Sequence, residues 1–350
     1  MSSENTHPAG AESAPLVCVL ILNWNGWRDT IECLESLLRL GYPRFQVVVC
    51  DNASTDGSVE HIAAWARGAE DAPETMRGVD AAGPRVPKPV PCVVLDGPEA
   101  ETGAPHARDV PLVLVRNGAN AGFAAGNNVG LRYALARGDF GYVWLLNPDT
   151  VVAPDSLEAL VAAAEADPGV GMLGATVLYY HAPDVMQAAA GGSLSRWIGT
   201  THLVATGGPA DAHVSPGPEM AYIHGACLLV RTELVRTVGM MDDRYFLYSE
   251  EVDWCVRARR AGWRLGYARR ARVWHKEGTS MGKRSAVQEF HTLRSRLLLL
   301  RRHFPLRYPV GLAYNALRSV APPVLRRDPE RLRLVLTVFR DHFKGASSSR

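Results

Sequence analysis

Apolar runs and helically spaced stretches alternate along the first part of the chain. Residues 16–22 form a continuous aliphatic run, which is typical of a strand buried on both faces, and helical spacing over 29–40 follows it. A second buried run at 45–50 leads through a polar turn into a helical stretch at 58–67. Two strand-then-helix units in succession predict an α/β fold with a Rossmann-like, mostly parallel central sheet flanked by helices.

The same alternation resumes after residue 111. The pattern there predicts strands at 112–115, 142–146, 170–179 and 222–230, helices at 122–137 and 155–166, and two short strands within 263–275. Asp155 stands at the start of the second of these helices, where an aspartate favours the N-cap. A glycine-rich stretch at 191–217 is expected to form a hairpin or a loop.

These patterns divide the chain into three parts. Residues 1–14 are expected to form a disordered tail, 15–284 the α/β domain, and 285–350 a basic C-terminal helical extension. Within the α/β domain, 68–111 is rich in Pro, Gly, Ala and acidic residues. We interpret it as an insertion with one short ordered stretch at 92–95.

Composition and charge narrow the choice of partners. The 38 Lys and Arg nearly balance the 36 Asp and Glu, so the net charge is only +2, which argues against a nucleic-acid partner. Basic residues gather in 257–307, which favours anionic lipid or a phosphorylated ligand, although a solvated helical face explains them equally. No apolar run reaches the ~20 residues of a membrane span, so we expect at most peripheral membrane contact.

The cysteines and the N-terminus bear on location. The six cysteines contain no CxxC pair, and several lie in apolar runs, where a thiol behaves as a small hydrophobe. The N-terminus has no basic patch followed by an apolar stretch, so it does not resemble a signal peptide. We therefore expect reduced cysteines in a cytoplasmic protein, with the inner face of the membrane as an alternative location.

Polar residues follow several of the predicted strands. They are Asn23, Asn25, Asp51, Asn117 and Asp149. Because ligands bind at the carboxyl edge of an open parallel sheet, these residues predict a site there. The first loop lacks the GxGxxG of a dinucleotide site and the GxxxxGK[ST] of a phosphate loop, which argues against a Rossmann dehydrogenase and a P-loop NTPase.

Three side chains suggest specific chemistry. Asp51 can accept a hydrogen bond from the N3–H of uracil or thymine or from a ribose hydroxyl, although aspartate is also a common turn former. Asp149, held by Pro148, suits a divalent cation bound to diphosphate oxygens, with His275 at a later strand end as a further candidate ligand. A turn aspartate and a hydrogen-bonded histidine are the simpler interpretations of these two.

Glu250, Glu251 and Asp253 fall in the first turn of a predicted helix. Acidic side chains there stabilise the helix dipole, which is sufficient reason for their presence. On an ideal helix Glu250 and Asp253 share a face and Glu251 points about 100° away, so not all three can reach one ligand. One of them can act as a general base if a partly buried site tunes its pKa.

Seven segments occur together in a fixed order. They are VCVLILNWNG at 17–26, VVVCDNASTDGS at 47–58, RNGANAGFAAGNNVG at 116–130, WLLNPDT at 144–150, GACLLVR at 225–231, FLYSEEVDWCVR at 246–257 and WHKEGTS at 274–280. In this combination they resemble glycosyltransferase family 2, the inverting enzymes of the GT-A fold, and within it the bacterial rhamnosyltransferase-like branch. The resemblance implies that 15–284 is a GT-A catalytic domain.

The resemblance also implies a donor site and a metal site. The residues that would bind the nucleotide-sugar donor are Asn23, Asn25, Asp51, Asn120, Gly122, Gly126, Asn127 and Asp149. Asp51 would recognise the base, and Asp149 would hold the diphosphate and a divalent metal, Mg²⁺ or Mn²⁺, with His275 as the other protein ligand. Asn147 stands in place of the first acid of the family's DxD motif.

The implied reaction has a base and an acceptor side. Glu251 would take the proton of the acceptor hydroxyl, with Glu250 beside it, and Asp253 and Arg294 would lie on the acceptor side. The donor would be a dTDP- or UDP-linked sugar, L-rhamnose or a related deoxysugar, and the acceptor a glycan, a lipid-linked saccharide or a small natural product. The alternatives are a nucleotidyltransferase, whose glycine-rich, Lys-bearing loop is missing after the first strand, and a catalytically silent sugar-nucleotide-binding or scaffold protein of the same fold.

Overall fold

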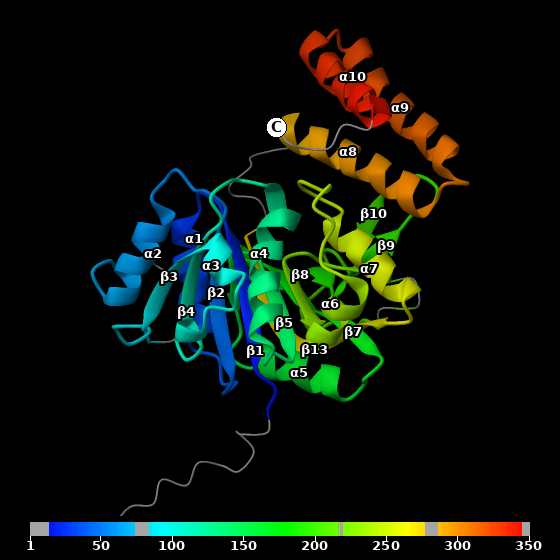
Figure 1. The fold of residues 1–350 in the computed structure, drawn as a ribbon. Coiled ribbons are helices and arrows are strands. Elements are labelled where there is room, and N and C mark those ends of the chain that lie inside the picture. The colour runs from blue at the N-terminus through cyan, green and yellow to red at the C-terminus, as the bar shows by residue number, and fades with distance from the viewer. Residues whose placement is uncertain (1–13, 74–83, 216, 218–219, 277–285, 345–350) are drawn as a thin grey trace, which may run out of the picture.

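A mixed, mostly parallel sheet runs through the centre of the protein, with helices on both faces (Figure 1). The computed structural model describes residues 14–73, 84–215, 217, 220–276 and 286–344. In spatial order the sheet contains β3 (Cys92–Asp96), β4 (Leu112–Arg116), β2 (Phe45–Asp51), β1 (Val17–Asn23), β5 (Tyr142–Leu146), β12 (Cys227–Arg231), β7 (Val170–Tyr179), β13 (Arg264–His275) and β6 (Thr150–Val152), with β8 (Ala182–Ala189) paired to β7. A small sheet contains β10 (Thr201–Leu203), β9 (Gly191–Leu194) and β11 (Tyr222–Ile223). The predicted α/β class is confirmed.

Helices cover the two faces of the main sheet and one of its ends. On one face lie α1 (Trp27–Leu37), α2 (Ser58–Arg67) and α5 (Ser156–Glu165), and on the other α3 (Gly97–Ala100), α4 (Gly122–Arg137), α6 (Thr232–Val238) and α7 (Glu250–Arg260). A 3-10 turn spans Pro105–Ala107. The last three helices, α8 (Ala286–His303), α9 (Tyr308–Leu325) and α10 (Pro329–Lys344), lie together beyond the end of the sheet at which β1 ends (Figure 1).

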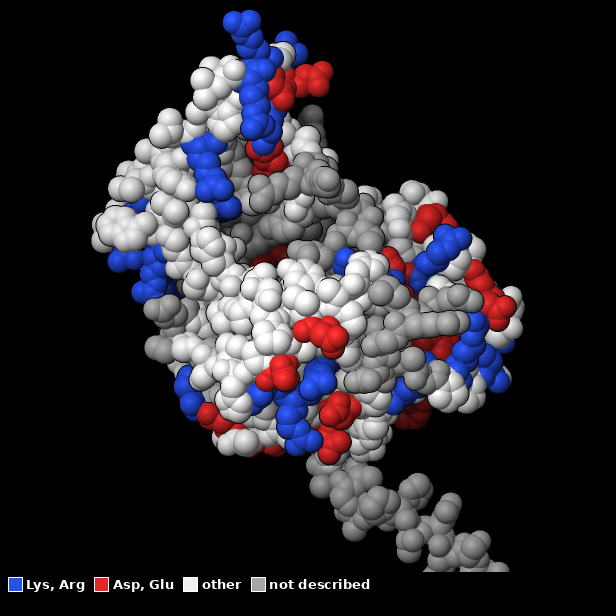
Figure 2. Space-filling view, turned by 180° about the vertical axis from the view of Figure 1, so that it is seen from behind, with Lys and Arg blue, Asp and Glu red and all other residues white. Residues whose placement is uncertain are grey.

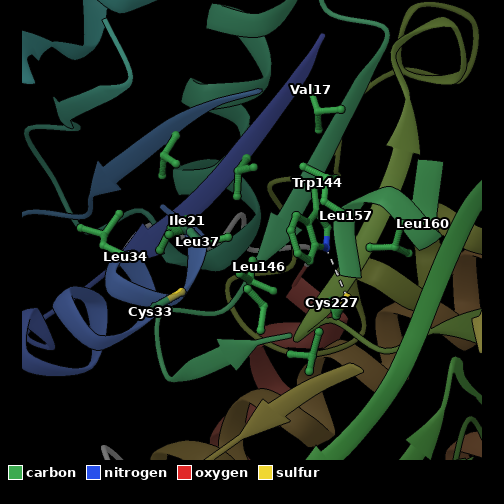
Figure 3. Packing of buried hydrophobic residues seen from close by; sticks show 14 of the residues in the cluster. Val17, Ile21, Cys33, Leu34, Leu37, Trp144, Leu146, Leu157, Leu160 and Cys227 are labelled. Carbon is green, nitrogen blue, oxygen red and sulfur yellow. Dashed lines mark hydrogen bonds between the residues drawn. The ribbon is translucent and has the colours of Figure 1, made fainter. Parts of the chain in front are cut away.

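The alternation of side chains along β1 explains why both faces are covered. Val17, Val19 and Ile21 lie in the cluster with α1, and Cys18 and Leu20 in the cluster with α4. Figure 3 shows the first cluster around Trp144 of β5, whose buried indole N–H donates to Cys227 Sγ at 3.2 Å. Alternate side chains of the same apolar strand therefore pack into the two hydrophobic clusters on opposite faces of the sheet.

Most predicted elements are present, and the differences have local causes. The strand expected over 222–230 is two strands, because a turn intervenes in which the Cys227 N–H donates to the His224 carbonyl at 3.2 Å. The two short strands expected within 263–275 are one strand, β13, whose register shifts between Ala268 and Arg272, so its alternation is interrupted. The stretch at 191–217 contains the β9–β10 hairpin. Asp155 occupies the N-cap position of α5, although its side chain makes no capping hydrogen bond.

The segment 68–111 contributes to the edge of the main sheet. Its β3 runs parallel to β4, with Cys92 opposite Leu112, and α3 follows at once. The ordered stretch expected at 92–95 is thus an edge strand. Residues 74–83 of this segment, and residues 1–13 of the expected tail, lie outside the described residues.

Buried polar contacts fix the C-terminal helices to the rest of the protein. His303 of α8 donates from Nε2 to the Asp253 carboxylate of α7 at 2.6 Å, and Arg260 donates to His303 Nδ1 at 2.8 Å. On α9, Asn315 Nδ2 donates to the Ile198 carbonyl at 3.0 Å. Through these contacts α8 and α9 are held over the carboxyl edge of the sheet.

Two further expectations can be compared with the described residues. None of the helices in this part of the chain is both long and apolar enough to cross a membrane. All six cysteines lie in this part too, and they are free thiols. Burial raises the pKa of Cys92, the least buried of them, to about 11, so this thiol is protonated at neutral pH.

Candidate active site

The carboxyl edge of the sheet brings polar side chains from several strands together. Asn23 and Asp51 are register partners at the ends of β1 and β2. Asp149 lies in the turn between β5 and β6, and His275 ends β13 opposite Thr150 of β6. The residues predicted from the strand ends therefore share one edge of the sheet.

Asp51 is almost fully buried and is held by three hydrogen bonds. Asn23 Nδ2 and Ser54 Oγ donate to Oδ1 at 2.8 and 2.6 Å, and the Ser54 N–H donates to Oδ2 at 3.0 Å. A carboxylate has about four acceptor positions, so Oδ2 can accept one more donor. A hollow of about 180 Å³, also lined by Ser54 and Arg116, opens beside it.

Asn23 and Asn25 stabilise the loops around Asp51 through hydrogen bonds. Asn23 is fully buried, and its Oδ1 accepts from Thr30 Oγ1 at 2.9 Å. Asn25 is exposed, and its Oδ1 accepts the Thr55 N–H at 2.7 Å. Both amides therefore hold the loops that carry Asp51.

The start of α4 is pressed against the segment that leads into α7. Gly122 has φ +87°, and a Cβ there would lie 2.3 Å from the carbonyl oxygen of Phe246. The Phe123 N–H donates to the same oxygen at 2.7 Å. Only a glycine permits this approach, so Gly122 joins the two segments.

The other α4 candidates lie close to the sheet. Asn120 Oδ1 accepts from Asn52 Nδ2 at 2.8 Å. A Cβ on Gly126 would lie 2.6 Å from Leu22 Cδ1, and Asn127 is buried. The residues of this segment thus lie against the carboxyl ends of β1 and β2.

Asp149 and His275 form a pair whose geometry is set by Gln187. His275 Nδ1 lies 2.9 Å from Gln187 Oε1, so Nδ1 carries the donated proton and Nε2 faces Asp149 Oδ1 at 3.3 Å. Asn147 Nδ2 lies 3.4 Å from the same Nε2. Burial favours the neutral form of Asp149, but the hydrogen bond and charge of His275 outweigh burial and hold the pKa of Asp149 below its usual range.

This pair fits two positions of a divalent metal site. Two neighbouring ligands of an octahedral Mg²⁺ or Mn²⁺ ion are roughly 3 Å apart, close to the 3.3 Å between Asp149 Oδ1 and His275 Nε2. A metal-bound histidine commonly donates its other ring N–H to an acceptor, as His275 does to Gln187. No three His, Cys, Asp or Glu side chains of the described residues gather as a metal site, so diphosphate oxygens and water would complete the shell.

His224 lies beside this pair. Its ring meets that of His275 edge-on, with centroids 5.8 Å apart, and its Nδ1 accepts the Ala226 N–H at 3.2 Å. Burial, helped by the nearby His275 charge, lowers the pKa of His224 to about 3. His224 is therefore a neutral imidazole with Nε2–H as its remaining donor.

Glu250 and Glu251 begin α7 after two residues in the left-handed region. Tyr248 and Ser249 both have φ +68°, a conformation that is costly for non-glycine residues and common at functional sites. Glu250 is buried, whereas Glu251 is partly exposed, and the Oε2 atoms of both lack a hydrogen-bond partner among the described residues. Both acids are thus held in place by the backbone of the turn.

The two acids differ in their pKa. Burial, reinforced by the charge of Glu251, raises the pKa of Glu250 well above its usual range. Burial also raises the pKa of Glu251, but backbone N–H groups at the start of α7 oppose the rise and leave it at about 7. The raised pKa of Glu250 favours its neutral form, and Glu251 is the acid whose pKa lies near neutrality.

Asp253 and Arg294 occupy different surroundings. Asp253 is fully buried, and besides His303 its carboxylate accepts from Arg257 Nε at 2.7 Å. It is therefore placed to hold α8 against α7. Arg294 of α8 donates to the Arg244 carbonyl at 2.8 Å and stays partly exposed.

The sequence analysis missed three residues of this site. Gln187 lies on β8, which was not predicted because Pro183 and Asp184 obscure the strand pattern. Arg116 ends β4 and was assigned no role beyond its place in a motif. His224 immediately precedes the GACLLVR segment, and this position was the one available signal.

Comparisons with known proteins identify the family to which the chain is similar. The model described as "Glycosyltransferase like family 2" matches residues 98–290, and the model described as "Glycosyl transferase family 2" matches residues 18–74. An N-acetylglucosaminyl-diphospho-decaprenol L-rhamnosyltransferase of Mycobacterium tuberculosis is 29% identical over 276 residues, which cover 71% of this chain and 89% of the relative. A low-salt glycan biosynthesis hexosyltransferase of Haloferax volcanii is 25% identical over 187 residues, covering 53% of this chain and 58% of the relative.

Solved structures share the fold. A mannosyltransferase of Pyrobaculum calidifontis in complex with GDP-Man and Mn²⁺ has a TM-score of 0.51 at 16% identity, over 96% of this chain and 77% of that one. GalNAc-T7 with UDP, GalNAc and Mn²⁺ has a TM-score of 0.55 at 14% identity, over 83% and 48%. Because one family match alone spans more than half of the chain, this protein belongs to glycosyltransferase family 2, the nucleotide-sugar-dependent enzymes of the inverting class.

Proposed function

We propose that this enzyme transfers L-rhamnose, or a related deoxysugar, from a dTDP- or UDP-linked donor to a hydroxyl of a lipid-linked saccharide. The sugar and the lipid-linked acceptor follow the name of the mycobacterial relative. A glycan or a small natural product is the alternative acceptor. In this proposal 15–284 is the catalytic domain and 285–350 its helical extension.

The observation that carries the proposal is the short link between the acids of α7 and the Asp149 turn. A Cβ on Gly225 would lie 3.8 Å from Glu251 Cγ. The next residue, Ala226, accepts the Asn147 N–H at 3.1 Å. A carboxyl that titrates near neutrality therefore lies one peptide away from the turn that would hold the diphosphate.

Each part of the site has one task in this proposal. Asp51 accepts the N3–H of the pyrimidine base, while Asn23, Asn25 and the α4 segment with Asn120, Gly122, Gly126 and Asn127 shape the nucleotide site. Asp149 and His275 would hold the cation and the diphosphate. Bound Mg²⁺ or Mn²⁺ offsets the negative charge that collects on the departing diphosphate. Arg294 faces the acceptor.

The chemistry is a single displacement at the anomeric carbon. The acceptor oxygen forms its bond to this carbon as the bond to the diphosphate oxygen breaks, so the configuration inverts. The hydroxyl proton passes to the Glu251 carboxylate. Burial and the charge of Glu251 favour the neutral form of Glu250, which supports Glu251 as the base.

A donor screen tests this function. Purified protein is incubated with UDP-, GDP- and dTDP-sugars and Mn²⁺, Mg²⁺ or EDTA, and release of the free nucleoside diphosphate is measured, with Glu251→Gln as the control. We expect slow hydrolysis of dTDP-L-rhamnose that EDTA lowers and the variant lacks. Preference for another sugar would overturn the rhamnose assignment. Absence of both hydrolysis and nucleotide binding in a thermal-shift assay would favour a silent scaffold.

A further inference from the structure

We propose that α9 is a membrane-contact helix that docks this enzyme on an anionic lipid surface. The inference rests on the proposed lipid-linked acceptor, and it adds the surface by which the enzyme would reach that acceptor. Its evidence is a ridge of exposed apolar side chains on α9, the charge around the ridge, and the position of the helix relative to the site.

The α9 ridge consists of Val310, Leu317 and Val324 with Leu306 and Leu325 at its two ends. Each of these side chains is more than half exposed, and Leu306 is 96% exposed. The first three are spaced by seven residues, which places them on one face of the helix. The buried Gly311 and Asn315 lie on the opposite face. An isolated exposed leucine needs no explanation, but a row along a whole helix marks an interaction surface.

The charge around the ridge selects the partner. Residues 286–344 contain twelve Lys and Arg but four Asp and Glu, a net charge of +8 in a chain whose total is +2. Arg307 precedes α9 and lies 4.9 Å from the centre of the half-exposed Trp197 ring, and Arg318 lies on α9 itself. Basic and aromatic side chains beside an apolar helix face are typical of a helix that lies in the headgroup layer of a membrane.

The α8–α10 lobe lies on the side of the sheet where the site is. Figure 1 shows these helices beyond the ends of the strands, and Figure 2 shows blue side chains along the lobe with red ones among them. The opposite face of α9 is tied inward through Asn315 and Ile198. A membrane against the α9 ridge would therefore lie on the acceptor side of the enzyme.

A second copy of the chain is the rival occupant of the ridge. A two-fold contact through α9 would bring two segments of net charge +8 together, and like charges at close range oppose association. Anionic lipid supplies the opposite charge and attracts each Lys or Arg near its surface. The charge therefore favours lipid over a dimer.

Vesicle sedimentation with the full chain tests the proposal. The vesicles contain phosphatidylcholine alone or equal parts of phosphatidylcholine and phosphatidylglycerol, without donor or acceptor. We expect the wild type to sediment with the second kind and to be released by salt. Leu317→Glu should lower the binding constant about tenfold or more, because it removes a buried apolar side chain and adds a negative charge beside anionic lipid. Val94→Glu, at an exposed apolar position on β3, is the matched control and should bind like the wild type.

The second variant and the readouts separate the outcomes. Arg318→Gln should weaken binding to the anionic vesicles and leave the melting temperature unchanged. The proposal is overturned if the wild type stays in the supernatant, or if Leu317→Glu binds as well as Val94→Glu. A wild-type dimer that Leu317→Glu converts to a monomer, without vesicle binding, would assign the ridge to a second copy. Nucleotide release is measured separately, so a failed donor assignment leaves the vesicle result intact.

Discussion

Replacing Glu251 by glutamine tests the proposed base most directly. A carboxyl whose pKa is about 7 is half ionised at neutral pH, which suits a group that must accept a proton during turnover. The rate should follow the ionised fraction, so it should fall about fivefold from pH 7 to pH 6 and level off above about pH 8. In Glu251→Gln we expect kcat to fall about 10²- to 10⁴-fold and the pH dependence to disappear.

Glu250→Gln is the matched control for this experiment. The raised pKa of Glu250 favours its protonated form, and glutamine has nearly the shape of the protonated acid. This variant should keep most of the activity and the same rising pH profile. Nucleotide release with a saturating donor, measured from pH 5.5 to about pH 9, gives the profiles. An inactive Glu250→Gln together with an active Glu251→Gln would refute the assignment.

The raised pKa of Glu251 also predicts an effect on stability. Its usual value is 4.5, and the folded value is about 7, so the unfolded chain loses the proton first as the pH rises. Stability from the protonated acid is therefore complete below about pH 4.5 and is lost by pH 7, by about 3 kcal/mol. Because glutamine does not ionise, Glu251→Gln should melt roughly 4–5 °C above the wild type at pH 8. At pH 5 the difference should nearly vanish, and an equal gain at both pH values would contradict the reasoning.

Three further predictions concern residues around the site. Asp253→Ala removes a buried carboxylate and should destabilise the fold by about 3–5 kcal/mol in urea unfolding, whereas Glu289→Gln, in an exposed ion pair, should cost less than about 1 kcal/mol. Gln187→Leu should weaken Mn²⁺ binding about 10- to 100-fold in a titration followed by electron paramagnetic resonance, because His275 loses its acceptor; unchanged binding would contradict this role. Gly122→Ala forces a Cβ into a backbone contact at φ +87°, so it should lower the melting temperature and kcat together, and a wild-type kcat would count against this coupling.

The sequence predicted the strands and helices whose hydrophobic pattern lies within a single element. Aliphatic runs identified the central strands, and the polar residues at their ends, such as Asp51 and Asp149, fall on the expected edge. Their partners were harder to predict. Gln187 fixes His275 from a strand 88 residues away, and Pro183 and Asp184 near the start of that strand obscure its periodicity. Contacts between segments distant in the sequence depend on the fold, so the local hydrophobic pattern does not predict them.

The resemblance to the family implies Glu251 as the base, but the residues of the turn alone do not distinguish it from Glu250. Both acids belong to the same turn and have the same side chain. Burial by other segments separates them, since it raises the pKa of Glu250 well above its usual range and brings that of Glu251 to about 7. The chemistry of the pair is therefore a property of the packing around α7.

The segment that leads into Glu250 and Glu251 contacts α4 on one side and α8 on the other, and both contacts are made by Phe246. On the donor side, Phe246 accepts the Phe123 N–H at the start of α4, where Gly122 permits the approach. On the other side, the ring of His291 on α8 stacks on Phe246 with centroids 4.7 Å apart. A shift of either helix must therefore move the backbone that leads into Glu250 and Glu251. The position of the proposed base thus depends on α4, which borders the donor in our proposal, and on α8, which joins the lobe that we place against the membrane.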